Sequence, residues 1–275
     1  MNTVIIVPTD FSAASVNASR YAADLAIAIQ AKLALVHIWH YPLNSEIPVT
    51  EEYINGLIED ATQSIEQERK DLEYKTSGKL EITASVRQGF FMTELQSMCA
   101  DHPHVIVIMG ALVTNATERI IFGSTILSAV RSLSVPLIIV PEGIKFAGIN
   151  IAGIACDLRD APHTVHTEEI KQLFNDFHPK LNVLHVSTKQ HGMLDEEEVK
   201  GTDWLKQALK DYNPSFHFMQ NENVSEAVRG FAEQNNIDLL IIIPKKHGLF
   251  NRLLHKSQSK QMIVNTHVPV LSIHE

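Results

Sequence analysis

The sequence predicts an α/β protein built from two similar halves, each a parallel β-sheet covered by helices on both faces. An apolar run that ends in aspartate occurs twice, as VIIVPTD at 4–10 and IAGIACD at 151–157. Two closing runs also match, VPLIIVP at 135–141 and VPVLSIH at 268–274. Between them, short apolar runs alternate with longer segments of helical period, which is typical of parallel sheets with crossover helices.

The chain length is sufficient for two domains. Its 275 residues are 45% hydrophobic, so each half can bury a core of its own. We predict a first domain at 1–143 and a second at 148–275. The joint between them, EGIKFA at 142–147, is short and polar rather than a flexible linker. The two halves are therefore expected to pack tightly against each other.

In the first half, the predicted strands are apolar runs that mostly lack strict alternation, as expected of strands buried on both faces. They lie at 4–7, 33–38, 80–87, 105–109 and 137–140. The first helix follows Ser12, a suitable N-cap, with apolar residues at helical spacing. A second begins near Tyr53 and continues into the charged EQERKDLEYK, and two more are predicted at 93–99 and 124–133.

The second half repeats this order of elements. Predicted strands lie at 149–156, 181–186, 215–219, 239–243 and 270–273. Predicted helices centre on 168–174, 198–209, 224–233 and 255–263. The right-handed crossovers of such units restrict the topology of each sheet.

Composition narrows the class of protein. The net charge of −9 argues against nonspecific binding to nucleic acid or to an anionic membrane. The two cysteines, Cys99 and Cys156, offer no disulfide framework and suit a reducing cytoplasm, which is the expected location. The start of the sequence does not resemble a signal peptide. No run approaches the ~18 apolar residues of a membrane span.

In an open parallel sheet, ligands bind beyond the carboxyl ends of the strands. Pro8, Thr9 and Asp10 end the first predicted strand, and Ile38 lies near the end of the second. Asp10 can hydrogen-bond a ligand there, or it can simply cap the following helix. His37 and His40 lie three residues apart at the same strand end, a spacing that does not bring two ligands to one metal, so no metal site is predicted.

The segment after Met109 has features of an anion site. Gly110 is expected to end the fourth strand, and thirteen residues later Gly123 precedes a helix that starts with Ser124 and Thr125. Glycine lets a phosphate approach the backbone, while the N–H groups and dipole of a helix start favour an anion. The alternative is an ordinary turn followed by an ordinary N-cap.

The run VPTDFS before an alanine-rich helix, together with MGALVTNATERIIFGSTILSAVRSLSVPLIIVP, resembles the universal stress protein family. The family pattern is glycine, two residues, glycine, nine residues, glycine, then serine or threonine. Gly110, Gly123 and Ser124 match it in register, and Val113 replaces the middle glycine. The resemblance covers essentially the whole chain as two tandem copies.

This resemblance implies the adenine nucleotide alpha hydrolase-like fold, with strand order 3-2-1-4-5 in each half. It also implies that the halves meet through their last strands, 137–140 and 270–273, as a pseudo-dimer within one chain; a further homodimer remains open. The expected ligand is ATP with Mg²⁺ in the first half, with the aspartate and second strand near the adenosine and the glycine loop around the phosphates. The implied nucleotide-binding residues are Pro8, Thr9, Asp10, Ile38, Gly110, Val113, Gly123, Ser124 and Thr125.

Val113 is the departure that weakens the nucleotide interpretation. A β-branched residue strongly disfavours positive φ, and its side chain occupies space that a phosphate would need. The intact ends of the motif favour an anion or nucleotide site, whereas the altered middle favours weak or absent ATP binding. Both alternatives stay open.

The second half departs further from the family pattern. Asp157 keeps the aspartate, but Pro244 replaces the first glycine and Lys256-Ser257 stands where the first half has Gly123-Ser124. This glycine-poor loop contains a basic cluster in an acidic protein. One interpretation is a site for a phosphate or an acidic partner; the other is a solvated helix face. The candidate residues are Lys245, Lys246, Arg252, Lys256 and Ser257.

The leading functional hypothesis is a stress-response regulatory protein that binds an adenine nucleotide in its first domain. A second hypothesis is a nucleotide-free interaction module that docks a protein partner through the basic loop. The third is a slow ATPase, which is disfavoured because no general base or water-orienting residue is evident. We therefore name no catalytic residue.

Overall fold

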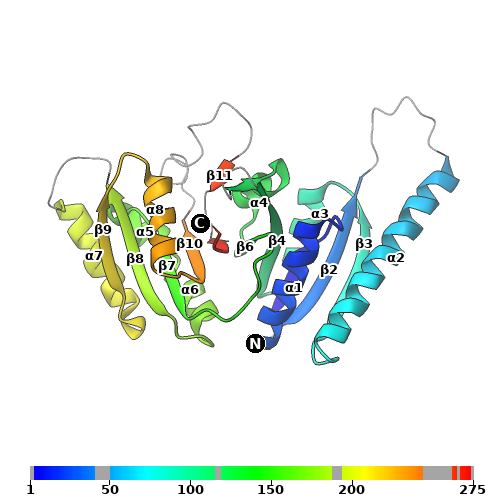
Figure 1. Ribbon diagram of the computed structural model, residues 1–275, viewed down its shortest axis with the longest axis horizontal. Helices are drawn as coiled ribbons and strands as arrows, with labels where there is room; N and C mark the ends of the chain where they lie inside the picture. The colour runs from blue at the N-terminus through cyan, green and yellow to red at the C-terminus, as the bar shows by residue number, and fades with distance from the viewer. Residues whose placement is uncertain are drawn as a thin grey trace.

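The computed structural model describes residues 3–40, 50–114, 119–187, 194–243, 262–264 and 267–273. It shows two α/β halves side by side (Figure 1). The first half contains β1 (Val4–Pro8), α1 (Ala13–Ala28), β2 (Lys32–Trp39), α2 (Glu51–Lys75), β3 (Ile82–Gln88), α3 (Phe91–Ala100), β4 (Val105–Thr114), β5 (Arg119–Phe122), α4 (Ser124–Ser132) and β6 (Leu137–Pro141).

The second half repeats the sequence of elements with shorter helices. It contains β7 (Ile151–Ala155), η1 (Leu158–Asp160), α5 (Ala161–Thr164), α6 (Thr167–Phe174), β8 (Lys180–Ser187), α7 (Glu196–Ala208), η2 (Lys210–Tyr212), β9 (Ser215–Gln220), α8 (Val224–Gln234), β10 (Leu239–Ile242), β11 (Met262–Val264) and β12 (Val270–Ser272). Most predicted strands and helices are confirmed to within about two residues at each end.

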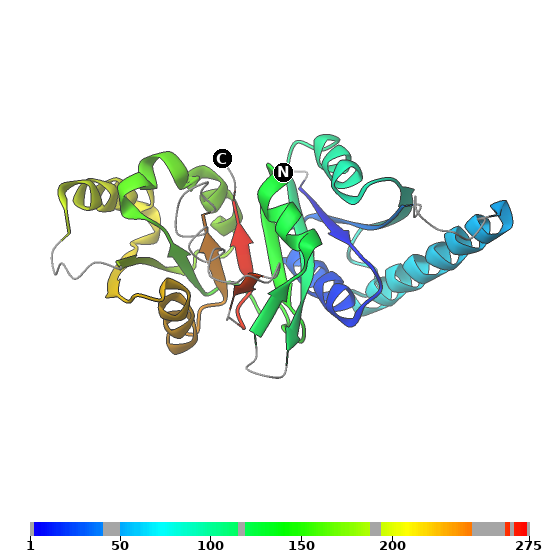
Figure 2. The same ribbon diagram turned by 90° about the horizontal axis from the view of Figure 1, so that it is seen from above.

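The strands of both halves form one continuous sheet in the order β3-β2-β1-β4-β6-β12-β10-β7-β8-β9. Neighbours within each half are parallel, and the predicted order 3-2-1-4-5 is confirmed in both. The halves join where β6 and β12 pair antiparallel, with Ile138 opposite Leu271. Figure 2 shows this junction at the centre of the molecule, with the red strands against the green ones.

The core lies on both faces of this sheet. One cluster packs alternate strand residues such as Ile5 and Ile154 against α1, α2 and α5 to α7. The other packs the intervening residues, such as Ile6, against α3, α4 and α8. Because both faces are covered, the central strands are apolar at almost every position, which is why their sequences lack alternation.

The fourth strand of the first half differs from the prediction. We expected it to end at Gly110, but β4 continues to Thr114 and places Gly110 opposite Val140 of β6. Residues 112–114 then leave β6 and pair antiparallel with β5, so that Val113 lies opposite Ile120. The extension is stable as a strand because β5 supplies the hydrogen bonds that β6 no longer offers.

The predicted helix at 255–263 is wrong at its carboxyl end. Residues 262–264 form β11, which pairs antiparallel with β5 and brings Ile263 opposite Ile121. The sequence Met-Ile-Val suits a strand because β-branched residues favour extended backbone. The earlier residues of that predicted helix lie outside the described ranges. The β5–β11 pair is a second connection between the halves, close to the label of α4 in Figure 1.

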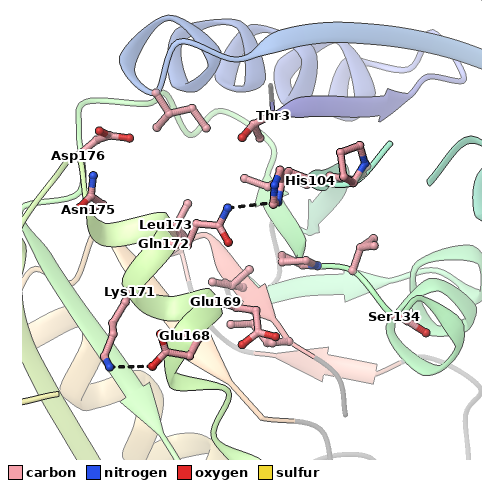
Figure 3. A pocket seen from close by; sticks show the side chains of 18 of the residues that line it. Thr3, His104, Ser134, Glu168, Glu169, Lys171, Gln172, Leu173, Asn175 and Asp176 are labelled. Carbon is pink, nitrogen blue, oxygen red and sulfur yellow. Dashed lines mark hydrogen bonds and ion pairs between the residues drawn. The ribbon is translucent and has the colours of Figure 1, made fainter. Parts of the chain in front are cut away.

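A cavity of about 900 Å³ lies between the halves, beside α6 and the residues that precede β4 and β6 (Figure 3).

Candidate functional site

The first strand of each half ends in the same turn. Asp10 accepts a hydrogen bond on Oδ1 from the backbone N–H of Ser12 at 3.1 Å. Asp157 accepts one from the N–H of Arg159 at 3.2 Å. Each aspartate therefore satisfies the backbone at the start of the next segment, which is the capping role considered for Asp10. The side chain of Asp10 is nevertheless exposed at the carboxyl edge of the sheet.

Asp10 is an anion at neutral pH. Partial burial alone would raise the pKa of its carboxyl, but hydrogen bonds from Ser12 and Ser15 hold the pKa below its ordinary value. An exposed carboxylate at this edge can accept hydrogen bonds from the hydroxyl groups of a ligand. Pro8, two residues earlier, is buried opposite Val36 and serves as the end of β1.

Thr9 points into the protein. Its hydroxyl lies 3.0 Å from Oε2 of Glu68 on α2, and Ser19 of α1 donates to the other carboxylate oxygen. Glu68 is only 8% exposed, so these hydroxyl groups satisfy a carboxylate beneath the site. The sequence analysis missed Glu68 because it occurs within a run of charged helical residues. Its role is to join α1 and α2 below the carboxyl edge.

Gly110 is required by packing. A Cβ at this position would lie 2.1 Å from the backbone oxygen of Ala14, because the first turn of α1 passes directly over β4. Close helix–strand contact therefore accounts for this glycine without a ligand. Val113 and Ile38 are both partly buried and pack against the same core cluster. Val113 is thus part of a paired strand rather than of an open loop.

Gly123, unlike Gly110, is not required by packing. Its φ is −63°, which any residue can adopt, and a Cβ built on it would meet no atom within 4 Å. It is the N-cap of α4 and makes no side-chain cap hydrogen bond. Gly123, Ser124 and Thr125 are all exposed. The first N–H groups of α4 are consequently open to an anion from outside.

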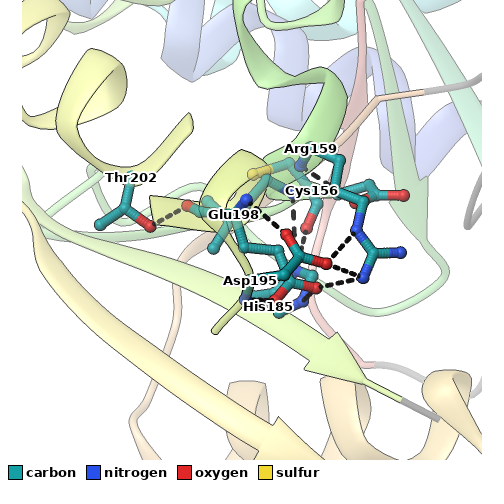
Figure 4. A network of polar contacts seen from close by, with 8 residues as sticks. Cys156, Arg159, His185, Asp195, Glu198 and Thr202 are labelled. Carbon is teal, nitrogen blue, oxygen red and sulfur yellow. Dashed lines mark hydrogen bonds and ion pairs between the residues drawn. The ribbon is translucent and has the colours of Figure 1, made fainter. Parts of the chain in front are cut away.

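In the second half, the same edge is occupied by a polar network (Figure 4). Arg159 contacts Asp195, with Nε 2.9 Å from Oδ2, and Glu198, with a guanidinium nitrogen 3.0 Å from Oε1. Nε2 of His185 lies 3.4 Å from the same Glu198 oxygen. His185 and Glu198 are 6% and 7% exposed. These side chains fill the region that follows Asp157.

The start of α7 holds this network in place. The side chain of Asp195 accepts the N–H of Glu198, and the side chain of Glu198 accepts the N–H of Asp195, each at 2.9 Å. This is a capping box, which satisfies two backbone donors at once. The N–H of Glu198 and then the guanidinium of Arg159 lower the pKa of Asp195. The network was not predicted from the sequence, although Asp195 followed three residues later by Glu198 is the pattern of a capping box.

The basic candidates Lys245, Lys246, Arg252, Lys256 and Ser257 lie outside the described residues. Within the described ranges, no three His, Cys, Asp or Glu side chains gather closely enough to hold a metal ion. No described helix combines the length and apolar character needed to cross a bilayer.

A model of the universal stress protein family matches residues 1–141, more than half of the chain. The chain belongs to the universal stress protein family. Comparison with curated protein sequences finds no match. Among solved structures, this universal stress protein is similar to one from Archaeoglobus fulgidus DSM 4304, with a TM-score of 0.74, 16% identity and 98% of each chain covered. A putative universal stress protein from Pseudomonas aeruginosa UCBPP-PA14 gives a TM-score of 0.56 at 12% identity, covering 99% of this chain and 93% of its own.

These structural likenesses show the fold, which extends over both halves. Because the family model matches only the first half, the family signal in the sequence is concentrated there. The second half keeps the family strand order while its candidate site has changed.

Proposed function

We propose that this universal stress protein is a stress-response regulatory protein that binds an adenine nucleotide, as Mg²⁺-ATP, in its first domain. The two domains are taken as 1–143 and 148–275. The nucleotide would lie across the carboxyl edge of the first sheet. There Asp10 would meet hydroxyl groups of the ribose, and the start of α4 would meet phosphate oxygens.

The observation that carries this proposal is the open helix start at Gly123. Its N–H groups have no side-chain cap, and the space beside its Cα is free to 4 Å. The positive end of the helix dipole favours an anion there. Asp10, after the carboxyl end of β1, supplies an exposed acceptor of hydrogen bonds.

The second domain supports the view that the two domains have different functions. Its equivalent edge contains Arg159, His185 and Glu198, which already contact one another. A nucleotide would have to break these contacts to enter. We therefore assign the nucleotide to the first domain alone, and the second domain to a structural or partner-binding role.

One observation favours the competing function of a nucleotide-free interaction module. Val113 is held opposite Ile120 in the β4–β5 pair, so the segment after Gly110 is a hairpin rather than a free phosphate-binding loop. If phosphates need that segment to wrap around them, affinity for ATP will be low. A slow ATPase is a third outcome, which only a turnover measurement addresses.

The test is to purify the protein, denature it and separate any released nucleotide by chromatography. Equilibrium binding of labelled ATP, with and without Mg²⁺, then measures affinity. Saturable binding with one site per chain supports the proposal. Absence of released nucleotide together with no saturation at millimolar ATP would reject it in favour of the interaction module. Release of ADP over hours, at a rate proportional to protein, would indicate the ATPase.

A further inference from the structure

Two grooves lie between the halves, and the repeat of the fold makes them equivalent. The first, which we call the linker groove, is bordered by residues 267–269 before β12, residues 237–238 before β10, and Tyr21 of α1. The second, the open groove, is bordered by residues 134–136 before β6, residues 103–104 before β4, and Glu169 of α6. The same three parts of the fold thus form both grooves, with the halves exchanged.

The linker groove holds a segment of this chain. Residues 142–143 form a turn after β6, and in the irregular segment 144–148 the side chains of Ile144 and Phe146 pack on the core whereas Lys145 is exposed. Phe146 packs edge-on against Tyr21 at a ring-centroid distance of 5.3 Å, and against Phe177 at 5.9 Å. The groove that remains beside this segment has a volume of only about 140 Å³.

The backbone of that segment is also held. Nδ2 of Asn17 donates to the carbonyl of Pro141 at 3.2 Å and to the carbonyl of Ile144 at 3.0 Å. The linker groove therefore holds a segment of polypeptide in which apolar side chains that pack on the core alternate with exposed ones.

The open groove has a volume of about 900 Å³ and no such segment among the described residues (Figure 3). Buried strand residues of both halves lie behind its surface, including Ile106 of β4 and Leu271 of β12. Val135 and Ile29 are partly exposed in it. A hydrogen-bonding contact between Nε2 of Gln172 and Nδ1 of His104, at 3.4 Å, crosses it.

The rim of the open groove differs from that of the linker groove in charge. Where the linker groove has Tyr21, the open groove has Glu169, and Asp176 lies farther along the same rim. Lys171 does not neutralise them, because its Nζ lies 2.8 Å from Oε1 of Glu168. Glu169 has His166 at 3.7 Å, and both Glu169 and Asp176 are exposed. The rim therefore favours a basic occupant.

We propose that the open groove is a docking site for an extended peptide of a partner protein. The peptide places apolar side chains at alternate positions on Val135 and Ile29, and it carries lysine or arginine that faces Glu169 and Asp176. This binding mode uses the alternation of a strand for specificity and peripheral charge for orientation. The inference is independent of nucleotide binding in the first domain.

The test uses a fluorescent peptide derived from the linker sequence, PKGIKFKGIN, which keeps the two apolar positions and adds basic residues. The control peptide, PKGSKSKGIN, has the same charge but lacks these two apolar side chains. We expect saturable anisotropy changes with the first peptide on the full-length protein, and affinity at least about tenfold weaker with the second.

Protein variants then locate the site. Ser134→Trp fills the groove from an exposed position, and Glu169→Lys with Asp176→Lys reverses the rim charge; each should weaken binding at least about fivefold. Glu233→Lys, an exposed change on α8, is the matched control and should leave affinity unchanged. Circular dichroism melting verifies that each variant is folded.

The proposal is overturned by no saturation up to about 1 mM peptide, by equal binding of the two peptides, or by affinity that Ser134→Trp does not change. Sedimentation distinguishes a second copy of this chain as occupant: concentration-dependent dimers that PKGIKFKGIN dissociates would replace the partner protein with the protein itself.

Discussion

His37 and His185 occupy the same position in the two halves and make the same contact. Each lies on the second strand, β2 or β8, and turns Nδ1 toward the carbonyl of the residue after the first strand. The distance is 2.8 Å to Thr9 and 3.4 Å to Cys156. The two halves therefore resemble each other down to individual hydrogen-bonding contacts at the carboxyl edge of the sheet.

The two histidines differ in what surrounds the rest of the ring. His37 stacks on Phe11 with centroids 4.7 Å apart, whereas His185 faces the carboxylate of Glu198. Beside the histidine ring, one copy therefore has an aromatic side chain where the other has a carboxylate.

The packing role of Gly110 predicts a stability effect that has nothing to do with ligands. Gly110→Ala should lower the free energy of unfolding by roughly 1–3 kcal/mol or more, since the new methyl group meets the backbone of Ala14. Gly230→Ala is the matched control: it has no atom within 4 Å, lies in α8, and should gain about 0.5–1 kcal/mol. Urea denaturation measures both; equal effects would contradict the packing argument.

The open start of α4 predicts a specific loss of nucleotide affinity. Gly123→Val should weaken ATP binding by about 1–3 kcal/mol because it shields the N–H groups, while the melting temperature changes little since φ is −63°. Isothermal titration calorimetry gives the affinity. Gly56→Val, at another open position, controls for the added side chain. Unchanged affinity in the folded Gly123 variant would place the site elsewhere.

Replacement of Val113 tests whether the hairpin limits binding. Val113→Gly should strengthen ATP binding by about 1 kcal/mol, or about fivefold, because it removes the side chain and loosens the pairing with Ile120. Titration of both proteins with Mg²⁺-ATP is the measurement. Low-micromolar binding by the wild type with no gain in the variant would mean that Val113 is compatible with the site.

The lowered pKa of Asp195 predicts an acid-dependent loss of stability. A carboxyl whose pKa is lower in the folded state stabilises that state at pH values above its ordinary pKa of 3.8, and this contribution is lost as the pH falls through the folded-state pKa. Asp195→Asn should therefore be less stable than wild type near pH 6, with the difference shrinking below about pH 4. Urea denaturation across this range tests it, and Asp60→Asn, on the exposed face of α2, is the control for removal of one carboxylate.

Cys99 should be unreactive in the native protein. Burial raises the pKa of its thiol to about 11, so only about 0.1% is thiolate at pH 8. Labelling with a thiol reagent, followed by mass spectrometry to locate the modified residue, should show Cys99 modified only after denaturant is added. Rapid labelling of Cys99 in the folded protein would contradict its burial.

Much of the fold was predictable because the sheet is buried on both faces. The apolar runs around Ile5, Ile108, Ile138 and Ile241 mark central strands wherever they occur, and the repeated aspartate turn marks the two halves. The pair β5–β11 was not predictable in the same way. These strands are short, and the partner of Ile121 is Ile263, far along the chain. Local periodicity carries no information about such a pairing.

The sequence predicted which residues lie at the candidate site, but not what each of them does there. Gly110 and Gly123 look alike in sequence, yet one is required by a helix above it and the other has free space around it. Glu68 and Glu198 occur in charged helical runs that predict solvent exposure, and both are buried. Their burial depends on which helix face meets the first helical segment of each half, and this is a tertiary property.

The antiparallel pairing of β6 with β12 within one polypeptide has a further consequence. Segment 142–150 keeps the second half at an effective concentration of millimolar order or more beside the first, so the pairing does not depend on how much protein is present. A two-chain assembly would have to retain every contact that holds it together against dilution. Here the peptide chain itself holds the two halves together, so fewer interface contacts are needed. The second half can therefore accumulate changes such as the Arg159–Glu198 network and still pair with the first.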